Sequence, residues 1–106
     1  MGNFDDANLL HKIKETVVAV QPEADVILYG SHARGTSTTM SDWDLLILVP
    51  HDSRAVRQAV RRRLYEIEWA GGEVISVVIR EKGDWNHPRL EKSPFHHNVE
   101  TEGIWL

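Results

Sequence analysis

Cysteine is absent from the 106-residue chain, which excludes disulfides, zinc–thiolate centres and thiol catalysis. Long apolar runs are absent as well, because no segment approaches the roughly 20 residues that a membrane helix needs. Residues 1–6 lack the basic and apolar blocks of a signal peptide, so we expect a cytoplasmic protein. An excess of positive charge is also missing, since the formal net charge is −4. This balance argues against sequence-independent binding to nucleic acid, which depends on neutralising phosphates.

The composition that is present is typical of one ordinary globular domain. Hydrophobic residues make up 42% of the chain and charged residues 26%. Its length suits a single domain over residues 1–106. A domain of this size cannot also build a large substrate-binding region. We therefore expect a bulky acceptor to lie on a partner or in an open groove.

The spacing of apolar residues predicts helices and strands that follow one another along the chain. Helices are predicted over residues 5–20, over 53–69 after a cap at Asp52 or Ser53, and over 93–103. Strands are predicted over residues 26–29, 43–49 and 73–80. Residues 30–41 predict a loop with one helical turn that starts near Ser31, and residues 82–89 predict a second loop. This order predicts a small α+β domain with helices packed on one face of a mixed β-sheet.

The segment from Gly30 to Gly35 follows the first predicted strand and suits phosphate binding. A glycine at the end of a strand lets the backbone approach a ligand closely. A helix that starts at Ser31 presents N–H groups and the positive end of its dipole to a phosphate. The Ser31 hydroxyl adds one more donor. Arg34 can reach the phosphates or can pin the loop through a carboxylate, and both interpretations stay open.

Asp42 and Asp44 lie two residues apart at the start of the second predicted strand, so their side chains share one face. Two such close carboxylates repel each other, and one of them should resist ionisation. A divalent cation removes this conflict, and Mg²⁺ suits such a site because it takes carboxylate and phosphate oxygens. Trp43 points to the opposite face, where we expect it to pack under the helices. An isolated Asp-x-Asp is usually structural, but the preceding Gly-Ser block favours a functional pair.

These residues closely resemble the G-S-x-A-R-G-x(n)-S-D-x-D-L signature of minimal nucleotidyltransferases, members of the DNA polymerase β-like superfamily. The resemblance covers residues 26–49 closely and the rest by the order of elements. It implies the polymerase β-like fold and the transfer of a nucleoside monophosphate from a nucleoside triphosphate, with ATP favoured, to a hydroxyl acceptor. By this resemblance Gly30, Ser31 and Ser41 bind the nucleotide, with Arg34 a further candidate. It also makes Asp42 and Asp44 the catalytic residues and the ligands of two Mg²⁺ ions.

One position departs from the pattern of active relatives. These relatives usually carry a third carboxylate on the strand after the next helix, and here the middle of that strand is Ser76. A serine cannot act as a carboxylate base. Glu73 lies at the edge of the strand with the opposite side-chain parity, and Glu66 and Glu68 end the preceding helix. The alternative function is therefore a catalytically degenerate module that binds nucleotide, or an antitoxin-like interaction module.

Partners are implied by the same resemblance, because minimal nucleotidyltransferases often pair with a small helical protein in toxin–antitoxin systems. A homo-oligomer also stays open. Five arginines between residues 54 and 63 are interpreted as a solvated helix face, with a docking surface for an acidic partner or RNA as the alternative. Trp69, Trp85 and Trp105 are expected in the core or at partner contacts. His32 is expected to be exposed in the loop.

Overall fold

The computed structural model describes residues 6–106. Its elements, in chain order, are α1 (Asp6–Val20), β1 (Asp25–Tyr29), α2 (Ser31–Arg34), β2 (Trp43–Val49), α3 (Arg54–Gly71), β3 (Ile75–Glu81), α4 (Lys82–Trp85), a 3₁₀ turn (Pro88–Leu90), α5 (Pro94–Glu102) and β4 (Ile104–Trp105). The three long predicted strands and the three predicted helices are all present. Asp5, the expected first residue of the first helix, lies outside the described residues. Within residues 6–106, no helix is long and apolar enough to cross a membrane.

The four strands form one sheet in the order β3-β2-β1-β4. β2 runs parallel to β3 and antiparallel to β1, and β4 pairs antiparallel with the other edge of β1. The sheet is therefore mixed, as predicted. β4 was not predicted because it has only two residues and both are exposed, so it carries no alternating pattern.

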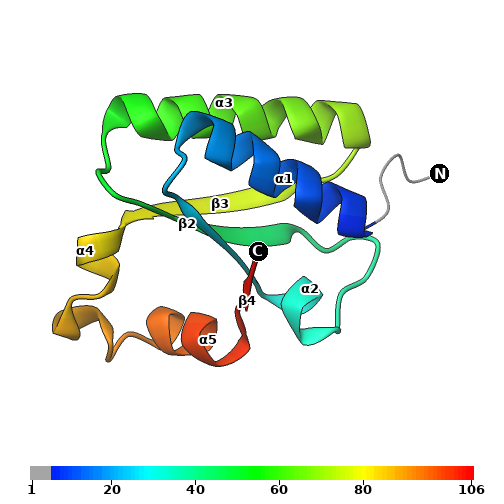
Figure 1. The fold of residues 1–106 in the computed structure, drawn as a ribbon. Coiled ribbons are helices and arrows are strands. Elements are labelled where there is room, and N and C mark those ends of the chain that lie inside the picture. The colour runs from blue at the N-terminus through cyan, green and yellow to red at the C-terminus, as the bar shows by residue number, and fades with distance from the viewer. Residues whose placement is uncertain (1–5) are drawn as a thin grey trace.

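The two long helices, α1 and α3, lie together over one face of the sheet (Figure 1). They bury Leu9, Ile13 and Val17 of α1 and Val60, Leu64 and Ile67 of α3. From β2, the alternate residues Trp43, Leu45, Ile47 and Val49 enter the same core. The predicted packing of helices on one face is thus confirmed for α1 and α3, whereas the third predicted helix, α5, packs on the opposite face. The predicted direction of the Trp43 side chain is confirmed as well.

The ends of α3 are set by local sequence. Ser53 caps its start, because the Ser53 hydroxyl accepts a hydrogen bond from Val56 N at 3.1 Å. Gly72 ends the helix with φ of 70° and donates its N–H to Glu68 O. The chain can therefore turn directly into the segment that leads to β3.

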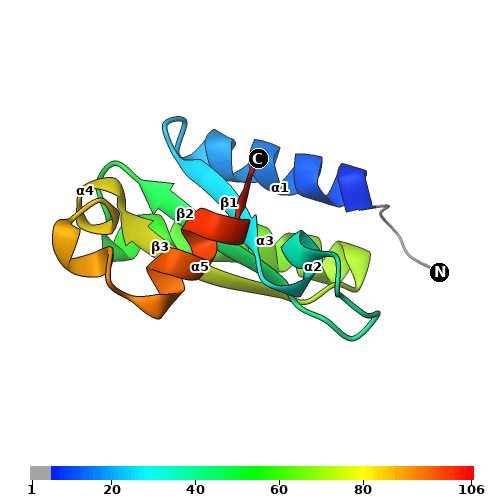
Figure 2. The ribbon, with the colours of Figure 1, turned by 90° about the horizontal axis from the view of Figure 1, so that it is seen from below.

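The opposite face of the sheet carries a second, smaller core. The sequence pattern did not predict that helices cover this face. Ile27, Leu46 and Leu48 pack there against Trp85 and Val99, which come from α4 and α5. Figure 2 shows α4, α5 and α2 following one another along this side. The prediction of a plain loop over residues 82–89 was wrong, because burial of Trp85 draws this segment into the short helix α4. Trp69 and Trp105, by contrast, stay exposed.

Candidate functional site

The turn after β1 is built around Gly30, which has φ of 77° and ψ of −159°. These angles lie in a region that only glycine adopts readily. Gly30 O accepts hydrogen bonds from the N–H groups of Ala33 and Arg34, both at 3.0 Å, so a helical turn begins at Ser31 as predicted. The N–H groups at the start of such a turn have no acceptor within the helix and face outward. The turn therefore has the backbone arrangement expected of a phosphate site.

The side chain of Asp44 packs directly against this turn. Antiparallel pairing of β1 with β2 places Asp44 opposite Tyr29, the residue before Gly30. A methyl group on Gly30 would overlap the Asp44 carboxylate and would lie 3.1 Å from its Cγ. The absence of a side chain at Gly30 is thus what allows the carboxylate to lie beside the start of α2.

Electrostatics distinguish the two aspartates. Burial raises the pKa of Asp44 above its ordinary value, and the neighbouring Asp42 raises this pKa further. His32 and Arg34 partly offset the effect. Asp42 is exposed, whereas Asp44 is half-buried. The expected repulsion between the paired carboxylates is therefore present, and a divalent cation between them and a phosphate would relieve it.

The carboxylates of Asp42 and Asp44 suit a Mg²⁺ ion that takes its remaining ligands from a bound nucleotide. Within residues 6–106, no group of three or more His, Asp or Glu side chains is placed to hold a metal ion. Asp42 and Asp44 place two carboxylates close to each other, and Asp44 lies against this turn. Mg²⁺ is commonly bound by one or two carboxylates together with phosphates and water. The residues present fit an ion of this kind once a nucleoside triphosphate supplies the other oxygens.

Arg34 and Ser41, two further predicted nucleotide-binding residues, are held within the loop. Arg34 Nη1 donates to Glu102 Oε1 of α5 at 3.0 Å, so the arginine pins the turn through a carboxylate in this structure. Ser41 Oγ accepts from Thr38 N at 2.9 Å and closes a turn of the loop. Whether either residue binds nucleotide stays a prediction.

Histidine at position 32 does not lie free in the loop, so the expectation of an exposed side chain was wrong. Its ring stacks on the buried indole of Trp43, with centroids 3.5 Å apart and planes at 10°. His32 Nε2 also lies 3.3 Å from Ser41 O. The stack joins α2 to the start of β2, and it therefore fixes the Gly30 turn relative to the two aspartates.

The family model of the nucleotidyltransferase domain matches residues 10–99. The chain belongs to this family. A crystal structure of a toxin–antitoxin with AMP-PNP shares the fold, with a TM-score of 0.58 and 19% identity over 90% of this chain and 69% of that chain. A crystal structure of a mutant toxin–antitoxin MntA–HpeT gives a TM-score of 0.55 and 17% identity over 98% of this chain and 72% of that chain. No curated protein sequence matches significantly. The predicted family and polymerase β-like fold are confirmed.

In this nucleotidyltransferase domain, Ser76 stands where sequence analysis places the third carboxylate. The parallel register pairs Ser76 with Asp44, so both side chains lie on one face of the sheet. Glu73 instead accepts a hydrogen bond from Trp43 Nε1 at 3.0 Å, and Trp43 belongs to the opposite face. Glu66 and Glu68 are on α3, which also covers that opposite face. None of these three glutamates therefore lies on the Asp44 side of the sheet.

Two residues of the site were not singled out from the sequence. Glu102 binds Arg34 across a separation of 68 residues, and no local pattern connects such positions. Tyr29, the last residue of the first predicted strand, lies opposite Asp44 across the strand pair. Burial raises the pKa of Tyr29, and Asp44 raises it further, whereas Arg80 lowers it. Pairing of the strands on either side of the Gly-Ser turn was the signal that could have identified Tyr29.

Proposed function

We propose that this nucleotidyltransferase domain transfers a nucleoside monophosphate from a nucleoside triphosphate, with ATP favoured, to a hydroxyl group on a partner protein. The observation that carries the proposal is the contact between Asp44 and Gly30. It brings the Asp44 carboxylate, which Asp42 neighbours, beside the one-turn helix that suits the triphosphate. Nucleotidyl transfer needs this combination, because it depends on positioning and on neutralising phosphate charge.

Each residue has a defined task in the proposed reaction. The Gly30–Ser31 backbone and the Ser31 hydroxyl bind the triphosphate, while Ser41 shapes the far side of the loop. Asp42 and Asp44 hold two Mg²⁺ ions, which when bound neutralise the attacking and leaving oxygens. Arg34 reaches a phosphate by exchanging Glu102 for a phosphate oxygen. The acceptor hydroxyl oxygen then attacks the α-phosphate, its proton is released to water, and pyrophosphate leaves.

One observation, the fold of the domain, supports an acceptor on another protein. This fold is that of the two toxin–antitoxin structures, one of which contains AMP-PNP. We therefore propose a toxin–antitoxin pair, in which a small helical partner carries the modified hydroxyl.

A second function is favoured by one specific observation, the serine opposite Asp44. Without a carboxylate there, the domain has no evident base to take the proton from the acceptor hydroxyl. The chain would then bind nucleotide and partner without turnover, as a degenerate module. Nucleotide binding that yields no transfer to the partner would identify this function.

Calorimetric titration with ATP, GTP, CTP and UTP, with and without Mg²⁺, tests the site itself. Wild type is expected to bind at least one nucleotide only when Mg²⁺ is present, and Asp42→Asn/Asp44→Asn is expected to lose this binding. Asp84→Asn removes an exposed carboxylate of α4 and serves as the control, because α4 contributes nothing to the Gly30 turn. Absence of binding by wild type would contradict the proposal for the isolated chain. An equal loss of nucleotide binding in Asp84→Asn would show that the effect comes from the change in net charge.

A further inference from the structure

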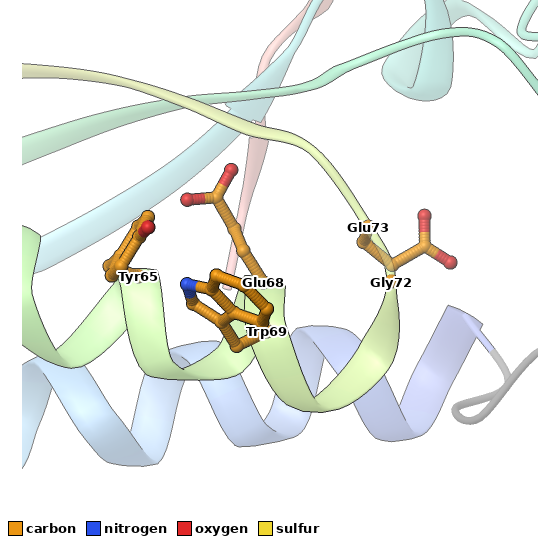
Figure 3. A pocket seen from close by; sticks show the side chains of 5 residues that line it. All are labelled: Tyr65, Glu68, Trp69, Gly72 and Glu73. Atoms are coloured by element: carbon orange, nitrogen blue, oxygen red, sulfur yellow. The ribbon is translucent and has the colours of Figure 1, made fainter.

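A hollow of about 370 Å³ lies at the C-terminal end of α3, away from the proposed site. It is lined by Tyr65, Glu68, Trp69, Gly72 and Glu73, as Figure 3 shows. α3 covers the face of the sheet opposite Asp44, so the aromatic wall of the hollow lies away from the Asp44 carboxylate, while Glu73 at its rim accepts the hydrogen bond from Trp43. Its function can therefore be considered independently of the proposed reaction.

Two aromatic rings give the hollow an exposed apolar wall. Trp69 is 74% exposed and Tyr65 is 56% exposed, and their rings meet edge to face with centroids 6.1 Å apart. Loose packing of α3 does not explain this exposure, because Val60 and Leu64 on the other side of the same helix are buried. Aromatic rings grouped in this way on a surface are characteristic of binding sites.

The charge beside these rings is negative and is held in place. Glu68 Oε2 accepts a hydrogen bond from Ile75 N at 2.8 Å, which holds the carboxylate next to the aromatic pair. Glu68 Oε1 has no donor among residues 6–106 and remains open to a ligand. Glu73 lies at the far rim, and Figure 3 shows its carboxylate directed away from the rings. Neither glutamate forms an ion pair with a cationic side chain within residues 6–106.

The nearest arginine on the same face of α3 does not neutralise this site. Arg61 lies one turn before Tyr65, and its Nη1 donates to Val77 O at 3.3 Å rather than to Glu68. That bond covers the free edge of β3. The hollow therefore offers aromatic faces and an available carboxylate to a cation from outside.

We infer that the Tyr65–Trp69 hollow binds the guanidinium group of an arginine on a partner protein. Aromatic faces attract cations, and a planar guanidinium can stack on the indole while it donates to Glu68 Oε1. A carboxylate would be repelled by Glu68. Nucleic acid would bring its phosphates towards two glutamates, which disfavours it as the occupant. A protein that presents an arginine has the complementary charge and shape.

Indole N–H resonances of the four tryptophans give a direct test by NMR. The probe is N-acetyl-arginine N-methylamide, and its uncharged control is N-acetyl-norleucine N-methylamide. The Trp69 resonance is identified by its loss in Trp69→Phe. The arginine probe is expected to change the chemical shift of this resonance until binding saturates. Trp105, which is 55% exposed on β4 at the other edge of the sheet, provides the internal control and should not move. An unmoved Trp69 resonance, or an equal shift with the norleucine probe, would overturn the inference.

Variants test whether the carboxylate takes part. Glu68→Gln keeps an oxygen that can accept from Ile75 N, so the fold should persist while the arginine probe binds about 5-fold more weakly. Glu91→Gln removes an exposed carboxylate remote from α3 and should bind as wild type does. Equal binding by Glu68→Gln and wild type would refute the role of Glu68. The Trp69 chemical shift is also followed as the protein is diluted without probe. A change on dilution would show that a second copy of this chain occupies the hollow, and would overturn the assignment to a different protein.

Discussion

Alanine substitutions at Gly30 and Gly35 test the contact that builds the proposed site. The two glycines flank α2 and have nearly the same φ, 77° and 79°, but ψ is −159° at Gly30 and 17° at Gly35. Alanine in the left-handed region of Gly35 costs about 1–2 kcal/mol of stability, and alanine in the glycine-only region of Gly30 costs about 1–3 kcal/mol. The two positions also differ in what a methyl group would meet.

At Gly30 the methyl group would overlap the carboxylate of Asp44, whereas at Gly35 it would have no atom of residues 6–106 within 4 Å. Relief of the overlap requires the carboxylate to turn away or β1 and β2 to separate, and overpacking of this kind costs about 1–3 kcal/mol. Gly35→Ala is thus expected to lose about 1–2 kcal/mol in total and Gly30→Ala about 2–6 kcal/mol.

Urea unfolding measures the stability of both variants, and calorimetry with Mg²⁺ and ATP measures their binding. Gly35→Ala is expected to bind nucleotide within about 3-fold of wild type, because a loss of stability short of unfolding leaves the site intact. Gly30→Ala is expected to lose detectable binding at temperatures where it is still folded. Equal losses of stability and equal nucleotide binding by the two variants would refute the role of the contact between Gly30 and Asp44.

Three further predictions concern neighbouring residues. Because burial and Asp42 raise the pKa of Asp44 above 3.8, the stability of the nucleotide-free protein falls as pH rises through that raised pKa. Asp44→Asn should therefore increase the free energy of unfolding at about pH 7, and this increase should shrink towards acidic pH. Urea unfolding at several pH values measures it, and an increase that does not depend on pH would contradict the prediction. Ser76→Asp should strengthen Mg²⁺-dependent nucleotide binding about tenfold in calorimetry, and an unchanged affinity would show that this position does not reach the metal site. Glu73→Leu leaves the buried Trp43 Nε1 without its acceptor and should cost about 1–3 kcal/mol in urea unfolding, whereas Glu73→Gln should cost less; equal costs would rule out the hydrogen bond as the cause.

Elements with a strong local pattern were predictable from the sequence. The strand over residues 43–49 matches β2 because its apolar run begins after a charged residue and stops at Pro50. Ser93 and Pro94 likewise predicted the start of α5, since a capping hydroxyl and a first-turn proline act within a few residues. The helical turn at Ser31 followed from the glycine before it.

Features that depend on contacts between distant segments were not predictable in the same way. α4 forms where Trp85 is buried against Ile27 and Leu46, and nothing in residues 82–89 alone shows that a core lies there. The stack of His32 on Trp43 requires the loop between them to fold back, which spacing does not reveal. The motif spacing thus predicted the aspartates and the turn as the site, but it could not show which contacts hold them together.

The bond from Arg34 to Glu102 also affects the order in which the protein can be assembled during synthesis. β4 pairs with Ile27 and Leu28, just before the Gly30 turn, and α5 supplies the carboxylate for Arg34. A ribosome makes the turn 68 residues before it makes that carboxylate. The two aspartates and the turn emerge early, but their surroundings are completed only when α5 and β4 have left the exit tunnel. A nascent chain halted before α5 would carry the whole signature motif and still lack the finished site.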